Sequence, residues 1–279
     1  MKTNIVKERP SFATSCIGIL LFCCIVSLFT ACRSGNKTVR VGGFEIDSVV
    51  VDTTLALTQA EGAPACQLSL HLHFLKEKKA QAMNDTLLRA GILLPDYFSL
   101  SKEKLSVREL VDSFVGRYLE EYRKEYAPLY QADREHATAY NVQYSVRSHF
   151  EKNADDVLTS IADIYTYGGG AHGIKQTLAL NIDTKKNQLI RLSDLFIDGS
   201  EPLLKDIIIQ HIGKQHEAES LADLQAKGIF ADGEVYLSEN FILGKDDITF
   251  IYGEDEIAPH AVGEIRVKVD LDDLKKFLK

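Results

Sequence analysis

The chain has 279 residues, 26% charged and 45% hydrophobic, with a formal net charge of −8. This composition excludes a wholly disordered chain, a collagen-like repeat and a protein with many membrane-spanning helices. The acidic balance, with no block of Lys or Arg, argues against nucleic-acid binding, which depends on clustered positive charge.

The first 32 residues have the pattern of an export signal, in which basic residues precede a short apolar run. The run from residue 17 to 31 is 15 residues long, fewer than the ~20 needed to cross a membrane. It ends in Leu28-Phe-Thr-Ala-Cys32, which resembles the lipobox of bacterial lipoproteins. The resemblance implies cleavage before Cys32 and acylation of Cys32, and a plain export signal, cleaved or uncleaved, is the alternative.

The predicted mature chain retains one cysteine besides Cys32, namely Cys66. It therefore has no partner for an internal disulfide and no cysteine-based zinc site. From residue 32 onward there are 29 basic and 39 acidic residues, a formal charge of −10. Anionic lipid repels such a domain, so the predicted lipid chain would supply the attachment. We expect an exported protein, lipid-anchored to a bacterial membrane and facing the periplasm or the cell exterior.

After the signal (residues 1–31) and a polar tether (32–38), the pattern divides into an N-terminal α+β module (39–140) and a C-terminal domain (141–279). Alternating apolar and polar residues predict strands over 44–50, with Phe44, Ile46, Ser48 and Val50 on one face, and over 66–74. Cys66 shares the apolar face of the second strand, so we interpret it as a buried hydrophobic residue.

Residues 80–92 are compatible with a helix. A stronger helix begins at Ser106, which forms a capping box with Glu109. The apolar face of this helix follows the 3.6-residue period, and we predict that the helix ends at Pro128.

Strands are predicted again over 142–150, 157–167 and 176–183, followed by a turn in which Asn187 tolerates a positive φ. A helical turn over 193–196 precedes a helix that has Pro202 in its first turn. The last elements are strands over 248–252 and 264–269 and a closing helix after Asp270.

Strands and helices do not alternate as regular βαβ units. We therefore predict an α+β fold with a mainly antiparallel sheet packed against a few amphipathic helices, in two adjoining subdomains. One face of the helix after Pro202 holds Leu203, Leu204, Ile207, Ile208, His211 and Ile212, and we interpret His211 on this apolar face as a core histidine.

Two motifs suggest chemistry, and each has a structural alternative. Gly168-x-Gly-x-x-Gly173 has the spacing of a dinucleotide-binding loop, but a strand pattern follows it where that motif requires a helix. We interpret it as a tightly packed loop. His71 and His73 would lie on one face of a strand and could bind a metal ion with His149, although two histidines on a solvated strand face are the commoner arrangement. We predict no cofactor, no metal site and no catalytic residue.

Two longer stretches resemble the RsiV/PdaC-type extracytoplasmic domain family. The first is Tyr165-Thr-Tyr-Gly-Gly-Gly-Ala-His172-Gly with the following Leu-Asn-Ile-Asp183 and Leu-Ser-Asp-Leu-Phe196. The second is Asn240-Phe, Ile-Thr-Phe250 and Glu256-Ile-Ala-Pro-His260-Ala-Val-Gly-Glu-Ile265. The resemblance implies an envelope-facing binding module whose ligand is lysozyme, a similar protein, or peptidoglycan. The acidic charge suits a basic protein better than an acidic glycan.

We therefore expect a lipid-anchored, non-enzymatic envelope binding protein. Its working surface is predicted in the loops 165–173 and 254–263, although these loops have the alternative role of closing the fold. Other functions that the sequence leaves open are a wall-acting, metal-assisted enzyme and a structural subunit of an envelope complex. The candidate ligand-binding residues are Tyr165, Tyr167, His172, Glu254, Glu256 and His260.

Overall fold

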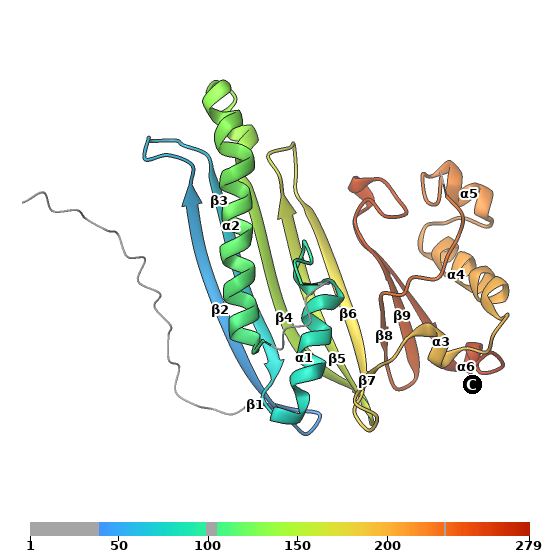
Figure 1. Ribbon diagram of the computed structural model, residues 1–279. Coiled ribbons are helices and arrows are strands. Elements are labelled where there is room, and N and C mark those ends of the chain that lie inside the picture. The colour runs from blue at the N-terminus through green and yellow to red at the C-terminus, as the bar shows by residue number, and fades with distance from the viewer. Residues whose placement is uncertain (1–38, 99–104, 232) are drawn as a thin grey trace, which may run out of the picture. The chain divides into compact units, whose positions relative to one another are not determined.

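The computed structural model describes residues 39–98, 105–231 and 233–279. The predicted signal, the lipidation site Cys32 and the tether lie outside these described residues. Two sheets, each with its own helices and core, form two subdomains (Figure 1). The predicted α+β class and the two subdomains are confirmed. In the described part of the chain, no helix has both the length and the apolar character to cross a membrane.

The larger subdomain is built on a seven-stranded sheet in which the strands follow chain order. Neighbouring strands are antiparallel except β3 and β4, which are parallel because a long helical crossover joins them. This sheet continues across residue 140, where the sequence suggested a boundary between modules. The strands are β1 (Val39–Val41), β2 (Phe44–Ala56), β3 (Ala65–Leu75), β4 (Val142–Ala154), β5 (Val157–Tyr167), β6 (Ile174–Asp183) and β7 (Gln188–Leu189).

The crossover begins with short turns and α1 (Gln81–Leu87) and continues, after the turn η2 (Leu88–Ile92), into the long helix α2 (Val107–Ala132). The predicted capping box at its start is present, since the Ser106 hydroxyl accepts from the Glu109 amide and Glu109 accepts from the Ser106 amide. The prediction that Pro128 ends this helix is wrong. The last turn continues to Ala132 because Tyr130 is buried and packs edge-on against Tyr140, which offsets the hydrogen bond that proline removes.

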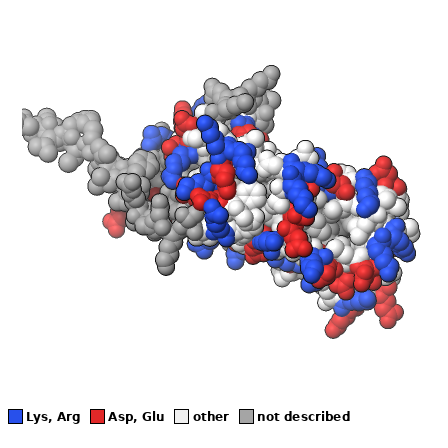
Figure 2. Space-filling view, turned by 90° about the horizontal axis from the view of Figure 1, so that it is seen from below, with Lys and Arg blue, Asp and Glu red and all other residues white. Residues whose placement is uncertain are grey.

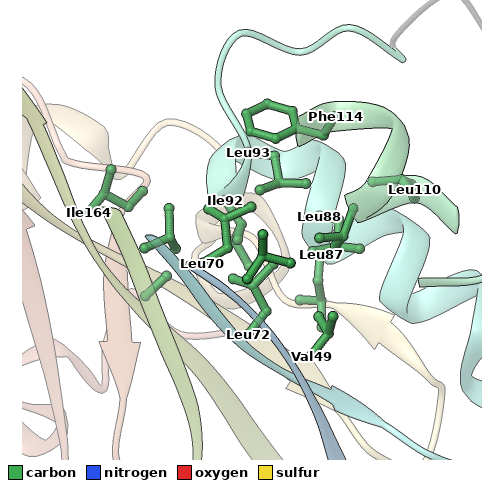
Figure 3. Packing of buried hydrophobic residues seen from close by; sticks show 14 of the residues in the cluster. Val49, Leu70, Leu72, Leu87, Leu88, Ile92, Leu93, Leu110, Phe114 and Ile164 are labelled. Atoms are coloured by element: carbon green, nitrogen blue, oxygen red, sulfur yellow. The ribbon is translucent and has the colours of Figure 1, made fainter. Parts of the chain in front are cut away.

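Both helices cover one face of the large sheet and bury its main core (Figure 3). Leu70 and Leu72 of β3 point toward Leu87 of α1 and toward Phe114 of α2. Cys66 extends the same face and is fully buried, as predicted. Its burial raises the pKa of the thiol to about 11, so it stays protonated at neutral pH.

The predicted strand over 44–50 is present as β2, but the predicted face is wrong at one end. Val50 is 56% exposed, whereas Val49 and Val51 lie in the core. Phe44 and Ile46 also pack on this core, so the inward face changes from even to odd positions between Ile46 and Val49. A change of face along a strand breaks the period-2 pattern on which the sequence prediction rested.

The smaller subdomain packs helices against the three-stranded sheet β10-β9-β8. Leu204, Ile208 and Ile212 of α4 are buried one turn apart, while Leu203 is 54% exposed, contrary to the predicted face. His211, predicted in the core, is half-buried. The closing helix is a single turn. The elements are α3 (Leu192–Leu195), α4 (Glu201–Gln215), α5 (Leu221–Ala226), β8 (Phe241–Leu243), β9 (Asp247–Tyr252), η4 (His260–Val262), β10 (Ile265–Asp270) and α6 (Leu271–Leu274).

The smaller subdomain covers the outer edge of β6 with side-chain acceptors. The amides of Lys175, Thr177 and Ala179 project from this edge. They donate to Glu254 (2.7 Å), Glu264 (3.0 Å) and Asn240 (2.8 Å) respectively. A strand edge left unpaired is a site of unwanted pairing, so these three side chains both join the subdomains and protect the edge.

Asn181 completes this junction from within the sheet. Its side-chain amide donates to the Phe241 carbonyl at 2.7 Å, and its oxygen accepts from the Leu243 amide at 3.0 Å and from the Thr159 hydroxyl at 2.9 Å. The side chain is 2% exposed, so every one of its polar groups is satisfied inside the protein.

Candidate binding groove

The face of the large sheet that points away from the helices carries polar side chains aligned in rows. One row crosses five strands in register, from Asp52 through Ser69, Ser145 and Tyr165 to Lys175. The adjacent row follows the same strands and contains Val50, His71, Arg147, Asp163 and Thr177. Register places these side chains on one surface, since residues at paired positions of neighbouring strands face the same side.

These rows form the floor of a groove of about 480 Å³, and the loop after β9 forms one wall. We call this cavity the sheet groove. A second hollow adjoins it over the ends of β2 and β3 and shares three of its residues. The polar residues that line the sheet groove are Ser69, His71, Ser145, Arg147, Asp163, Tyr165, Lys175, Gln176, Thr177, Glu254 and Glu264.

Charges of both signs lie in the sheet groove. Arg147 and Lys175 supply positive charge, and Asp163 and Glu254 supply negative charge. Glu264 is held in place by Arg266, whose Nε lies 2.6 Å from its Oε1. Acidic and basic side chains are also interspersed on the face of the molecule shown in Figure 2. The groove therefore offers hydrogen bonds of both polarities rather than a field of one sign.

Asp52 is held in its charged form at the end of the first row. The Ser69 hydroxyl donates to its Oδ1 at 2.6 Å, and Nε2 of His71 lies 3.1 Å from both carboxylate oxygens. These contacts, led by the Ser69 hydrogen bond, lower the pKa of Asp52. Because this pKa is lower in the folded protein, Asp52 stabilises the fold at pH values above the ordinary aspartate pKa. This contribution is lost as the pH falls through the pKa that Asp52 has in the folded protein.

Replacement of Ser69 with alanine should raise the pKa of Asp52 toward the ordinary aspartate value of 3.8, because the donor that favours the carboxylate is removed. A titration of the Asp52 carboxyl carbon followed by NMR measures the change. Ser145→Ala is the matched control, since Ser145 is the next residue of the same row and lies one strand farther from Asp52. An Asp52 pKa unchanged in Ser69→Ala would contradict this assignment.

The structure brings the two predicted loops together. The imidazoles of His172 and His260 stack with their centroids 3.8 Å apart and their planes 20° apart. Nδ1 of His260 also lies 3.1 Å from Asp255 and 4.0 Å from Glu254. Tyr165 and Glu254 line the sheet groove, so four of the six candidate residues lie at or beside this cavity.

The other two candidate residues lie elsewhere. Tyr167 is at the end of β5, one row beyond Tyr165, and pairs with Gln143. Glu256 closes its own loop by accepting from the Gly253 amide and from the Tyr236 hydroxyl. Burial, with this hydrogen bond to Glu256, raises the pKa of Tyr236. Glu256 therefore shapes the loop from within.

The glycine-rich loop has the structure of a tight connection. Gly169 has a φ of 81°, and a Cβ there would lie 1.9 Å from the carbonyl oxygen of Ala139. A Cβ at Gly173 would meet the Tyr165 ring at 2.4 Å. The loop leads into strand β6, as predicted. These glycines allow close packing, and the missing side chain of Gly173 leaves room for the ring of Tyr165 in the groove floor.

The three histidines considered as metal ligands each have a separate partner. His71 contacts Asp52, His149 lies 3.1 Å from Glu151, and Nδ1 of His73 contacts the Ser148 carbonyl. Within residues 39–98, 105–231 and 233–279, no three His, Cys, Asp or Glu side chains are arranged to hold a metal ion.

Most of the groove could not be recognised from the sequence. Ser69, Ser145, Arg147, Asp163 and Lys175 are the polar members of alternating strands, a pattern that is also typical of an ordinary solvated face. The available signal was the strand register, which would have aligned these residues in rows. That register depends on the parallel pairing of β3 and β4, which are separated by 66 residues of intervening chain.

Comparison with known proteins identifies the smaller subdomain. A family model described as "Protein of unknown function (DUF3298)" matches residues 193–272, from α3 to the start of α6. A DUF3298 family member from Bacteroides fragilis has a similar structure, with a TM-score of 0.73 and 25% sequence identity over 86% of this chain and 95% of that one. A DUF3298 family protein from Pseudomonas aeruginosa, at 14% identity, shares the fold with a TM-score of 0.58 over 85% of this chain and 94% of that one.

A curated relative extends the comparison. The chain is 27% identical over 179 residues to the peptidoglycan-N-acetylmuramic acid deacetylase PdaC of Bacillus subtilis. The match covers 61% of this chain and 37% of the relative, so the chain spans little more than a third of that protein's length. The chain thus carries a DUF3298 domain of the PdaC/RsiV-like type, and the predicted relationship is confirmed.

Proposed function

We propose that this protein is a lipid-anchored, non-enzymatic component of the bacterial cell envelope that binds peptidoglycan in the sheet groove. The observation that supports this proposal is the alignment of polar side chains in register across five strands beside the loop after β9. Acylation of Cys32 would hold the groove near the membrane, within reach of the wall.

The lining of the sheet groove suits a glycan that carries carboxylates. Hydroxyl and imidazole groups from Ser69, Ser145 and His71 offer donors and acceptors to sugar hydroxyls. The half-buried ring of Tyr165 offers an amphipathic surface to a sugar ring. Arg147 and Lys175 can pair with carboxylates of the lactyl or peptide parts of a wall fragment. The similarity to a peptidoglycan deacetylase agrees with this ligand class.

A basic protein such as lysozyme is the second candidate ligand. The observation that favours it is the charge of the mature chain, with 29 basic and 39 acidic residues from position 32 onward. Opposite net charges accelerate encounter and are screened by salt. In this case the exposed Asp255 and its neighbours on the loop after β9 would contribute more than the floor of the groove.

A retention experiment separates the two ligands. The protein from Ser34 onward, without its lipid, is incubated with purified peptidoglycan and with immobilised lysozyme at low and high salt. We expect retention by peptidoglycan, weakened about tenfold in Arg147→Ala and in Tyr165→Ala, which corresponds to about 1.4 kcal/mol. His149→Ala is the matched control, because His149 follows Arg147 on the same strand face and lies outside the groove lining.

Each other outcome of the retention experiment contradicts a specific part of the proposal. Peptidoglycan retention that is equal in wild type and both groove variants would contradict the assignment of the sheet groove. Salt-sensitive retention of lysozyme alone would replace peptidoglycan with a basic protein as the ligand. Retention by neither would contradict both candidate ligands.

A further inference from the structure

A second cavity, lined by tyrosines, lies on the opposite face of the large sheet. It has a volume of about 370 Å³ and lies between α2 and the inward-facing residues of β4 and β5. We call it the tyrosine groove. Its aromatic lining comes from Tyr97, Tyr118, Tyr122, Tyr126 and Tyr144, and its acidic lining from Glu121 and Glu125.

The rings of the tyrosine groove include two aromatic pairs. Tyr118 stacks on Tyr144 with centroids 5.4 Å apart, and Tyr122 lies 5.2 Å from Tyr126. The Tyr122 hydroxyl donates to the Tyr140 carbonyl at 2.9 Å, which fixes the ring. Burial raises the pKa of Tyr118 and of Tyr126, so both phenols are neutral at neutral pH. Neutral rings present negative faces and apolar surface together.

Two carboxylates accompany this surface. Glu121 and Glu125 are one helical turn apart on α2, a spacing that places their Cβ atoms roughly 5–6 Å apart on the same side of the helix. Among the described residues that line the cavity there is no lysine or arginine. Aromatic faces beside acidic groups favour a cation that carries an apolar stem.

The protein already holds a cation in this manner at the edge of the tyrosine groove. The guanidinium carbon of Arg117 lies 4.5 Å from the centroid of the Tyr97 ring, and its Nε lies 3.3 Å from Glu121. The Tyr97 hydroxyl donates to the same carboxylate at 2.6 Å. The Arg117–Glu121 pair is about half exposed on both sides, so it is weak and leaves Glu121 able to take a further partner.

We propose that the tyrosine groove binds an alkylammonium group, with the aliphatic stem against Tyr118 and Tyr126 and the ammonium beside Glu121 and Glu125. The same chemistry occurs in a free diamine and in the lysine side chain of a peptide. The site is separate from the sheet groove and lies across the sheet from it, so neither proposal depends on the other.

Binding of two amine probes tests the proposal. 1,4-Diaminobutane and N-acetyl-lysine methylamide are titrated into the protein at low salt while the tyrosine ring signals are followed by NMR, with 1,4-butanediol as the neutral analogue. We expect at least one amine to bind and shift Tyr118 and Tyr126, and the diol to cause no comparable shift. A response to the diamine alone identifies a free amine as the natural class, and a response to the lysine derivative alone identifies a peptide.

Matched variants on α2 locate the site. Glu125→Gln keeps the shape of the side chain and removes its charge, and we expect it to weaken amine binding about tenfold. Glu120→Gln makes the same change at an exposed position outside the cavity lining, and we expect wild-type binding. Unfolding curves of both variants show whether the fold is retained. Equal binding by Glu125→Gln and wild type, equal shifts with diol and diamine, or binding of neither amine would overturn the proposal.

Discussion

Asn181→Ala should lower the free energy of unfolding by about 3–5 kcal/mol, because it leaves two buried backbone groups without partners and removes the acceptor of a buried hydroxyl group. These groups are the Phe241 carbonyl, the Leu243 amide and the Thr159 hydroxyl, each bonded to the Asn181 side chain. Two of the three belong to β8, so the loss falls on the contact between the two sheets. Urea denaturation followed by circular dichroism measures the change, and a separate early transition of the smaller subdomain would show where the contact fails.

Asn153→Ala is the control for this prediction. Asn153 donates to the same Thr159 hydroxyl at 2.8 Å, whereas the hydrogen bonds to Phe241 and Leu243 of β8 come from Asn181, and the side chain of Asn153 is half-buried. We expect a loss of about 1 kcal/mol, typical of a single hydrogen bond. If Asn181→Ala were no more destabilising than Asn153→Ala, the junction would not depend on the buried asparagine.

Gly169→Ala should also have a large effect, lowering the free energy of unfolding by at least about 2 kcal/mol. An L-residue at a φ of 81° is strained by roughly 1–2 kcal/mol, and the new Cβ would meet the Ala139 carbonyl oxygen at 1.9 Å. The backbone must therefore move, and the loop that carries His172 would move with it. Thermal unfolding measures the stability, and the NMR signals of the His172 and His260 rings report the loss of their stacking.

Gly168→Ala separates this effect from a general sensitivity of the loop. A Cβ at Gly168 would meet nothing within 4 Å, and its φ lies outside the left-handed region. We expect a change within about 0.5 kcal/mol of wild type, as for most surface substitutions. Equal losses at the two positions would show that the close approach to Ala139 does not explain the glycine.

The local features of the fold could be predicted from the sequence because they depend on local chemistry. The capping box at Ser106 is a four-residue pattern, and Asn187, with a φ of 53°, occupies the left-handed turn position expected for it. The alternation from Cys66 onward identified β3 and its buried face. The loops 165–173 and 254–263 were predicted as one working surface from their glycine, proline, histidine and acidic residues, and the stacking of His172 on His260 shows that they meet.

The remaining features depend on contacts between distant residues. Helix α2 continues past Pro128 because Tyr130 packs against Tyr140. This contact cannot be predicted from the residues next to the proline. Val50 faces outward because β2 changes its inward face between Ile46 and Val49. The sheet groove requires the register of five strands at once, and each strand alone shows only an alternating polar face.

Locating a bound wall fragment tests most directly whether peptidoglycan binds in the sheet groove. A soluble peptidoglycan fragment is titrated into isotope-labelled protein while side-chain signals are recorded by NMR. We expect saturable shifts at Ser69, Arg147, Tyr165 and Lys175, which share the floor of the sheet groove. Saturable shifts confined to other surfaces, or no saturable shift, would contradict the assignment of the sheet groove as the peptidoglycan-binding site.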